Sequence, residues 1–262
     1  MSKETIKLYD KPYENGFMPT MTIFPCDDKV RGAVIIYPGG GYSHYGSLEQ
    51  SLVAERFNEL GFHAFVVIYS VSPLHYPSQQ RDALRAVRMV RKDAAKYNVD
   101  PEKIAVCGFS AGGHLAGTAG VLYDRIDSTC GDEYDEASPR PDAMILSYPV
   151  ISMSGEYAHI GSANNLIGCD DAEKREFLSI EKQITENTPP AMCWITADDK
   201  AVNRDNPIMF ARAMWAAGRD CELHVFPHGP HGLGLNTERE DVGQWSTLAA
   251  TFLYTTCKFP RI

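Results

Sequence analysis

The sequence predicts an α/β fold in which a mainly parallel central sheet is flanked by helices on both faces. Short apolar runs rich in β-branched and aromatic residues alternate with longer segments of helical period. Several of these runs lack the polar alternation of a half-exposed strand, which is typical of parallel strands covered on both faces. Strands that alternate with helices of this length imply βαβ units and therefore a mainly parallel sheet.

Glycine and proline residues mark the ends and starts of several expected helices. Gly61 and Gly218 follow the last turns of two helical segments, and Pro207 stands at the start of another, as helix ends and starts favour. The expected strands are 33–37, 63–69, 104–107, 143–146, 192–196 and 223–226, and the expected helices are 48–60, 78–97, 114–122, 207–217 and 244–254.

The chain, residues 1–262, is expected to form a single domain, because no repeat, low-complexity tract or linker divides it. Residues 151–190 depart from the strand–helix pattern, since they are polar, contain three glycines and end at Pro189-Pro190. Two interpretations of this segment stay open. It is either a helical excursion between two strands or a partial lid over an active site.

The charge balance limits the classes of partner. With 25 basic and 34 acidic residues the formal net charge is −9, which argues against nucleic acid or an anionic membrane as a partner. The first residues lack the apolar segment of a secretory signal, and no apolar run approaches the ~18 residues of a membrane span. We therefore expect a cytoplasmic protein, and the sequence leaves homo-oligomers open.

The seven cysteines are expected to be free thiols that act as small core hydrophobes. Their number is odd, no CxxC pair occurs, and Cys107 and Cys193 lie within apolar runs. No His, Cys and Asp cluster has zinc spacing and HExxH is absent, so we expect neither a metal nor a cofactor.

The strongest functional signal is the segment Ile104–His114, IAVCGFSAGGH. It reads as a strand, then G-x-S-x-G, then a helix. In such a turn the serine is strained, and Gly108 and Gly112 remove the side chains that would clash with it. We predict that Ser110 is a nucleophile and that the N–H of Ala111 at the helix start contributes to an oxyanion hole.

A second glycine cluster, Pro38-Gly-Gly-Gly-Tyr42, follows the strand expected at 33–37. Glycine lets backbone N–H groups approach a substrate closely, so we predict that Gly40 and Gly41 complete the oxyanion hole. A tight turn without catalytic duty is the alternative. A phosphate-binding loop is excluded, because neither G-x-x-x-x-G-K-[ST] nor G-x-G-x-x-G can be read here. Which two of the three glycines point inward stays open.

A serine nucleophile needs a base within hydrogen-bond reach, and in this chain order an acid precedes the base. His231 lies deep in a loop rich in Gly and Pro after the last expected strand and is the predicted base, with His228 as the alternative. The acid is expected at the end of the preceding strand, where Asp198 and Asp199 are adjacent. Asp199 is favoured because it stands three residues before Val202.

Several other residues have weaker signals. Tyr42, His44 and Tyr45 follow the glycine cluster and are candidates for lining an acyl or sugar pocket, or else are surface residues of the loop. Further expectations concern packing: His114, Trp194 and Trp215 as core or helix-packing residues, and Arg81, Arg85, Arg88 and Arg91, with Asp82, as a solvated or salt-bridged helix face.

Taken together, four motifs resemble those of α/β-hydrolase esterases of the acetyl-xylan or carbohydrate acetyl esterase type, which are related to the hormone-sensitive-lipase-like esterases. The similarity runs from about Val30 to about Leu253. Pro38 replaces the histidine of the HGGG motif, and Asn203 stands where many relatives have proline. The motifs are Pro38–Tyr42, Gly108–His114, Thr196–Asp199 and Phe226–Gly232.

This resemblance implies the α/β-hydrolase fold and the hydrolysis of acetyl or other short acyl esters, sometimes feruloyl esters, on sugars. It implies a triad of Ser110, Asp199 and His231, an acyl-enzyme, no cofactor, and a small-molecule or oligosaccharide ester as substrate. Two rivals stay open. A prolyl-oligopeptidase-like serine peptidase shares the triad order but usually adds a large N-terminal domain. A catalytically silent ligand-binding protein of this fold commonly lacks a triad member.

Overall fold

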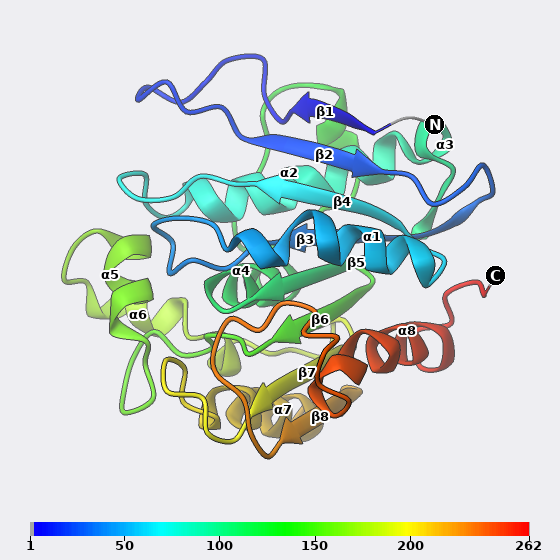
Figure 1. The fold of residues 1–262 in the computed structure, drawn as a ribbon. Coiled ribbons are helices and arrows are strands. Elements are labelled where there is room, and N and C mark those ends of the chain that lie inside the picture. Colours follow the sequence, from blue (N-terminus) through cyan, green and yellow to red (C-terminus); the bar gives the residue numbers. More distant parts are fainter. Residues whose placement is uncertain (1–2, 262) are drawn as a thin grey trace.

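The computed structural model describes residues 3–261, in which eight strands form one sheet (Figure 1). The strand order is β1-β2-β4-β3-β5-β6-β7-β8. From β4 to β8 in this order adjacent strands are parallel, as predicted. At the other edge β2 is antiparallel to both β4 and β1. The strands are β1 (Glu4–Lys7), β2 (Thr20–Phe24), β3 (Arg31–Tyr37), β4 (His63–Ile68), β5 (Val99–Phe109), β6 (Ala143–Ser147), β7 (Ala191–Thr196) and β8 (Cys221–Phe226).

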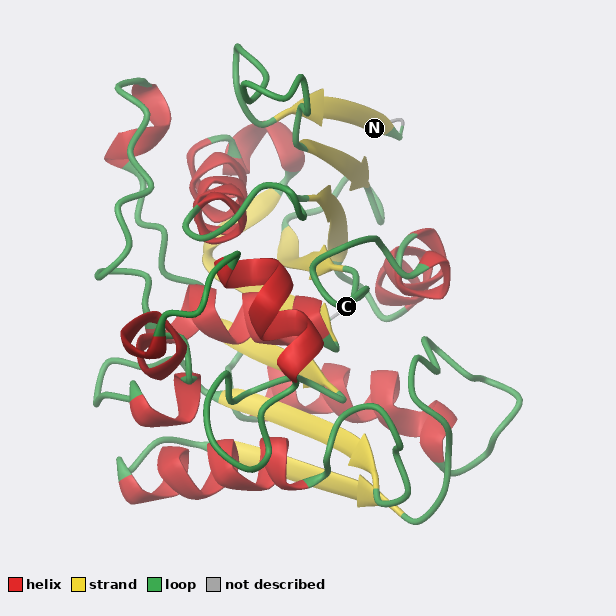
Figure 2. Ribbon diagram, turned by 90° about the vertical axis from the view of Figure 1, so that its left-hand side faces the viewer, coloured by secondary structure: helices red, strands yellow, loops and turns green. Residues whose placement is uncertain are grey.

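Helices cover both faces of this sheet, as predicted (Figure 2). One face carries α1 and α8, and the other carries α2 and α4 (Figure 1). The helix expected at 78–97 is interrupted at Asp93, so that α3 follows α2 as a separate turn. The helices are α1 (Ser51–Glu59), α2 (Ser78–Lys92), α3 (Ala94–Tyr97), α4 (Ala111–Val121), α5 (Ile160–Ile167), α6 (Ala172–Phe177), α7 (Asp205–Ala216) and α8 (Trp245–Thr255), with 3-10 turns η1 (Ser47–Glu49), η2 (Glu133–Glu136), η3 (Ile180–Lys182) and η4 (Val242–Gln244).

Two strands were missed by the sequence analysis, and both lie at the N-terminal edge of the sheet. No residue of β1 is buried, so it has no apolar run to mark it. β2 alternates between buried and half-buried residues because only one of its faces packs on the core. In contrast, all seven residues of β3 are buried, which is the pattern expected of a central parallel strand.

The core contains only part of the residues that the sequence placed there, since Cys130 and Cys169 are exposed. Cys107 and Cys193 are fully buried free thiols, and Trp194 is also fully buried. The prediction for Trp215 was wrong, because half of this residue (52%) is exposed. Its indole N–H donates to the carbonyl of Cys221, the first residue of β8, at 2.9 Å. Within residues 3–261 no helix is long and apolar enough to cross a membrane.

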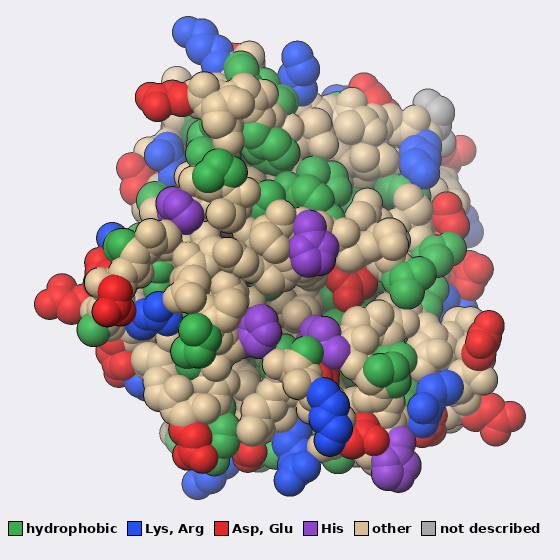
Figure 3. Space-filling view, turned by 60° about the vertical axis from the view of Figure 1, so that its left-hand side comes forward, with side chains coloured by type: hydrophobic (Ala, Val, Ile, Leu, Met, Phe, Trp, Pro, Cys, Tyr) green, Lys and Arg blue, Asp and Glu red, His purple; other side chains and the backbone are tan. Residues whose placement is uncertain are grey.

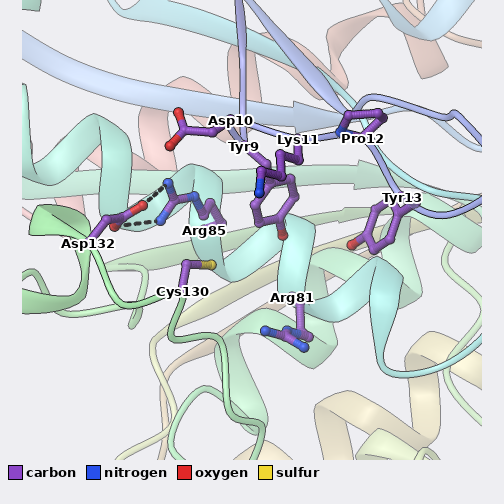
Figure 4. A pocket seen from close by; sticks show the side chains of 9 residues that line it. All are labelled: Tyr9, Asp10, Lys11, Pro12, Tyr13, Arg81, Arg85, Cys130 and Asp132. Atoms are coloured by element: carbon purple, nitrogen blue, oxygen red, sulfur yellow. Dashed lines mark hydrogen bonds and ion pairs between the residues drawn. The ribbon is translucent and has the colours of Figure 1, made fainter.

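The arginine face of α2 is salt-bridged at two positions, Arg85 and Arg91. Arg85 is buried and forms a two-pronged ion pair with Asp132, while its Nε donates to the carbonyl of Leu8. Figure 4 shows this pair at the wall of a cavity of about 400 Å³, which is also lined by Tyr9 and Tyr13. These charged groups are therefore engaged with one another and fasten the N-terminal segment to the helix.

Asp82, on the same helix, is a buried carboxylate that joins three segments of the chain. Its Oδ1 accepts hydrogen bonds from the hydroxyls of Tyr9 (2.9 Å) and Tyr13 (2.6 Å), and its Oδ2 accepts one from the N–H of Ser70 (2.7 Å). Burial raises the pKa of the Asp82 carboxyl to about 6, and these hydrogen bonds partly offset that rise. The carboxylate is thus the common acceptor for the N-terminal segment, α2 and the loop after β4.

We predict that Asp82→Ala lowers the free energy of unfolding by about 2–4 kcal/mol, because it leaves several donors without an acceptor. Urea denaturation at pH 7 measures this change. Asp10→Ala, at an exposed aspartate of the same cavity, is the matched control and should stay within about 0.5 kcal/mol of the wild type. Equal stability of the two variants would contradict the assigned role of Asp82.

Candidate active site

Ser110 occupies the turn that joins β5 directly to α4, with φ 54° and ψ −117°. A positive φ is strained for any residue other than glycine and persists only where the surroundings impose it. A Cβ on Gly108 would lie 1.9 Å from the carbonyl oxygen of Gly112, and one on Gly112 would lie 2.1 Å from that of Tyr37. Both positions therefore require glycine, for the reason that the sequence suggested.

The structure brings Ser110, His231 and Asp199 into one hydrogen-bonded chain. His231 Nε2 lies 2.8 Å from Ser110 Oγ, and His231 Nδ1 lies 2.7 Å from Asp199 Oδ2. The serine follows β5, the aspartate follows β7 and the histidine follows β8, so all three lie at the carboxyl edge of the sheet. This is the geometry that nucleophilic catalysis by serine requires.

Asp199 is held in place by the backbone that follows it. Its Oδ1 accepts hydrogen bonds from the N–H groups of Ala201 (2.8 Å) and Val202 (3.0 Å), which explains the spacing that favoured this residue. Its side chain is only 1% exposed. Burial alone raises the pKa of the carboxyl, but the hydrogen bonds from His231 and the backbone outweigh it, and the pKa lies below its usual value. Asp199 is therefore a carboxylate at neutral pH.

The two alternative residues pair with each other instead. His228 Nδ1 lies 3.1 Å from Asp198 Oδ2, and the N–H of Gly229 donates to Asp198 Oδ1 at 2.8 Å. Both side chains are exposed. The Asp198 carboxylate thus caps the loop that carries His231 and does not reach Ser110.

The glycine cluster supplies two unpaired N–H groups to the site. The N–H of Gly39 donates to Glu49 Oε2 at 2.6 Å and is therefore not available to a substrate. Those of Gly40 and Gly41 donate to no acceptor within residues 3–261, and both glycines line the same pocket as Ser110. Ala111 is the first residue of α4, so its N–H has no acceptor within the helix.

A pocket of about 430 Å³ opens at Ser110 Oγ. Figure 3 shows several histidine side chains gathered near the middle of one face of the molecule, and three histidines line this pocket. The lining residues are Gly40, Gly41, His44, Gly46, Ser47, Leu48, Glu49, Ser110, His159, Ala201, His231 and Gly232.

Of the three residues proposed to line the pocket, only His44 does so. Tyr42 follows Gly41 with φ 61° and is fully buried, and its hydroxyl lies 2.7 Å from Nδ1 of His114. Tyr45 donates its hydroxyl to the carbonyl of Tyr69. The left-handed backbone at Tyr42 turns this side chain beneath the loop, so the predictions for Tyr42 and Tyr45 were wrong.

His114 is a buried packing residue, as expected. Its Nε2 donates to the carbonyl of Leu178 at 2.7 Å, which leaves Nδ1 to accept the hydroxyl proton of Tyr42. Burial lowers the pKa of His114 to about 4, so the ring is neutral. This bond network joins α4 to the loop after β3 and to residues 151–190.

Glu49 is a buried carboxylate at the site that the sequence analysis missed. Besides the N–H of Gly39, it accepts the hydroxyl proton of Tyr148, at 2.7 Å from Oε1. The Tyr148 hydroxyl in turn accepts the N–H of Gly234 at 3.0 Å, and the ring packs against that of His231 with centroids 4.9 Å apart. Glu49 thereby joins the glycine loop to the loop that carries the histidine.

Residues 151–190 form α5, α6 and η3 and reach the site through α5. His159, at the start of α5, lines the pocket, and Asn165 donates to the carbonyl of Gly41 at 2.8 Å. Neither contact has a signal in the sequence, because the segment has no motif that places it beside the glycine loop. No group of three or more potential metal ligands is found in residues 3–261.

A match to the BD-FAE family covers residues 24–214, which is more than half of the chain. The chain belongs to the BD-FAE family. The matched range includes the glycine cluster, Ser110 and Asp199.

Two proteins that are similar to this chain in sequence agree with the resemblance seen in the motifs. The chain is 38% identical over 245 residues to endo-1,4-beta-xylanase B of Butyrivibrio fibrisolvens, covering 91% of this chain and 38% of that protein. It is 29% identical over 258 residues to acetylxylan esterase of Xylanibacter ruminicola, covering 94% of this chain and 51% of that protein. The chain thus spans about half or less of the length of these relatives.

A solved structure matches the chain over nearly its whole length. The acetyl ester-xyloside bifunctional hydrolase from Caldicellulosiruptor lactoaceticus is 38% identical, and the match covers 97% of this chain and 96% of that one with a TM-score of 0.91. The α/β-hydrolase fold that the motifs imply is thereby confirmed.

We predict that Glu49→Gln lowers the free energy of unfolding by about 1–3 kcal/mol, because one amide oxygen cannot accept from both Gly39 and Tyr148 and a buried donor loses its partner. Urea denaturation of the wild type and the variant measures the change. Glu55→Gln, at an exposed position of α1, is the matched control and should leave stability unaltered. A loss of equal size in both variants would show that the bonds to Glu49 are not the cause.

Proposed function

We propose that this protein is a serine carboxylic-ester hydrolase that acts on short acyl esters, above all acetyl esters, of carbohydrates, and that its 262 residues form a single catalytic domain. The observation that carries the proposal is the hydrogen-bonded chain from Asp199 through His231 to Ser110, which ends in a pocket beside unpaired glycine N–H groups. The names of the relatives, an acetylxylan esterase and an acetyl ester-xyloside hydrolase, support it.

In the first half of the reaction, Ser110 Oγ attacks the ester carbonyl while its proton passes to His231 Nε2. The carbonyl oxygen becomes an oxyanion that accepts hydrogen bonds from the N–H groups of Gly40, Gly41 and Ala111. Each such donor is often worth about 3–4 kcal/mol. Asp199 holds Nδ1–H of the imidazole and stabilises the imidazolium.

Collapse of this intermediate breaks the bond to the alcohol, which leaves with the proton from His231. The acyl group then remains on Ser110 as an ester. Water attacks this ester, His231 accepts a proton from the water, and the serine takes it back as the carboxylic acid leaves. Ser110 and His231 thus regain their initial protonation states, and the catalytic cycle needs no group from outside the chain.

The lining of the pocket supports a neutral sugar ester as substrate. Among its described residues there is no Lys or Arg that would pair with an anionic sugar, and the carboxylate of Glu49 lies at its inner wall. Ser47, His44 and His159 instead offer groups that form hydrogen bonds with hydroxyls.

We expect the wild type to hydrolyse p-nitrophenyl acetate faster than the butyrate and the octanoate, because the proposed substrate carries a short acyl group. Ser110→Ala should lower kcat by at least about 10³-fold, because the nucleophile is lost. Initial rates at saturating and limiting substrate measure both effects. Cleavage of a peptide p-nitroanilide but not of the acetate would favour a peptidase, and no turnover by folded wild type would favour a ligand-binding protein.

The two adjacent aspartates provide a second prediction. Asp199→Asn should lower kcat by about 10³–10⁴-fold, because an amide cannot hold the imidazole in the required tautomer. Asp198→Asn, the matched control next to it, should stay within about threefold of the wild type because it only caps the loop. Measured kcat values with p-nitrophenyl acetate decide the assignment, and the reverse order of effects would transfer the role to Asp198.

A further inference from the structure

His159 brings a third histidine to the pocket from outside the predicted catalytic motifs. It stands at the N-cap of α5, where its Nδ1 accepts the N–H of Ser162 at 3.2 Å and lies 2.8 Å from the Ser162 hydroxyl oxygen. The residue is partly buried and lines the pocket together with Ser110 and His231. Its position is therefore fixed by the helix start.

The hydrogen bond at Nδ1 determines which nitrogen of His159 carries the proton. A ring nitrogen that accepts a backbone N–H must present a lone pair, so the neutral ring is protonated at Nε2. Burial, and then the nearby imidazole of His231, lower the pKa of His159, so the ring is neutral at neutral pH. Within residues 3–261 its Nε2 has no hydrogen-bond partner, which leaves one free N–H donor at the pocket wall.

The location of His159 assigns this donor to one half of the substrate. His159 lines the pocket together with His231, Gly232 and Ala201, which belong to the loops that carry the base and the acid of the proposed triad. In a serine hydrolase the alcohol leaves towards the base, since the base returns its proton to that oxygen. A donor that shares the pocket with the base is therefore assigned to the alcohol half of the ester.

We propose that Nε2–H of His159 donates a hydrogen bond to the hydroxyl next to the esterified carbon of a sugar, and so makes His159 a specificity-determining residue for vicinal hydroxy esters. This inference rests on the proposed esterase function. A donor fixed in advance loses little entropy when substrate binds, which favours its use in recognition.

The same helix is fastened to the oxyanion side of the pocket. Asn165 donates to the carbonyl of Gly41, and the Ser162 hydroxyl lies 4.0 Å from the position of a Cβ on that glycine. Since His159 and Gly41 are connected through α5, the donor to the alcohol keeps a set distance from the oxyanion loop. An ester binds at both points when its carbonyl oxygen reaches the N–H groups of the glycine loop and its neighbouring hydroxyl reaches Nε2–H of His159.

Two esters that differ in one hydroxyl test this proposal. They are the acetate of cyclohexanol and the monoacetate of trans-1,2-cyclohexanediol, and each rate is divided by the rate of alkaline hydrolysis of the same ester. We expect the wild type to prefer the hydroxy ester about tenfold in kcat/KM, the effect of one added hydrogen bond.

Two variants separate recognition from helix capping. His159→Asn keeps an acceptor for Ser162 N–H, but its shorter side chain leaves no N–H at the position of Nε2, so the preference should fall to about one. His159→Gln places an amide N–H near the position of Nε2 and should keep part of the preference. His224→Asn, the same change on β8, where the ring lies beside Glu222, is the control and should keep the wild-type ratio.

The outcomes distinguish this inference from the proposed function. A wild type that hydrolyses both esters without preference overturns the role of His159 alone, and so does a preference that survives His159→Asn. Rates for both esters that are unchanged in His159→Asn but fall by the same factor in His159→Gln mean that His159 only caps α5, which also overturns it. A folded wild type that hydrolyses neither ester nor p-nitrophenyl acetate overturns the esterase function itself.

Discussion

The close approach of the start of α4 to the end of β3 fixes the layout of the whole site. At Gly112 the helix backbone lies so near Tyr37 that a Cβ would be 2.1 Å from its carbonyl oxygen. The loop that leaves β3 therefore begins beside Ser110, and a Cβ on Gly39 would lie 3.0 Å from that of the serine. The proximity of the proposed oxyanion donors to Ser110 is thus a consequence of backbone packing, with glycine required on both sides of the contact.

Buried carboxylates keep the loops around this contact in place. Glu49 accepts from the glycine loop and from Tyr148, whose hydroxyl in turn receives the N–H of Gly234. By binding Gly39, it also removes one of the three N–H groups of the cluster and so defines which two remain for a substrate. Asp199 acts in the same way on the loop after β7, where backbone N–H groups hold one oxygen and leave the other for His231. In both cases the two oxygens of one buried side chain bind donors from different segments and hold these segments together.

The parts of the site that the sequence predicted are those whose geometry is local. The strained turn at Ser110 needs glycine two residues away on either side, and the Asp199 carboxylate bonds N–H groups two and three residues on, so both leave a pattern of fixed spacing. The residues next to Tyr42 in the sequence do not indicate its positive φ, and the prediction that it lines the pocket failed for that reason. Glu49 and His159 reach the site through tertiary contacts between distant segments, which no periodicity encodes. For the same reason the central parallel strands were found, whereas β1 and β2 at the edge were not.

The excursion at residues 151–190 is tied to the site by hydrogen bonds at two separate points. Asn165 bonds the carbonyl of Gly41, and the carbonyl of Leu178 receives the N–H of His114 on α4. A displacement of α5 that moves His159 must therefore also disturb the oxyanion loop. On the proposed assignment, recognition of the alcohol and stabilisation of the oxyanion are coupled through one helix. The rim that Leu48 forms in η1 is fastened to the same loop, because the neighbouring Glu49 accepts the N–H of Gly39, so substitutions on either side of the pocket act on the glycine cluster.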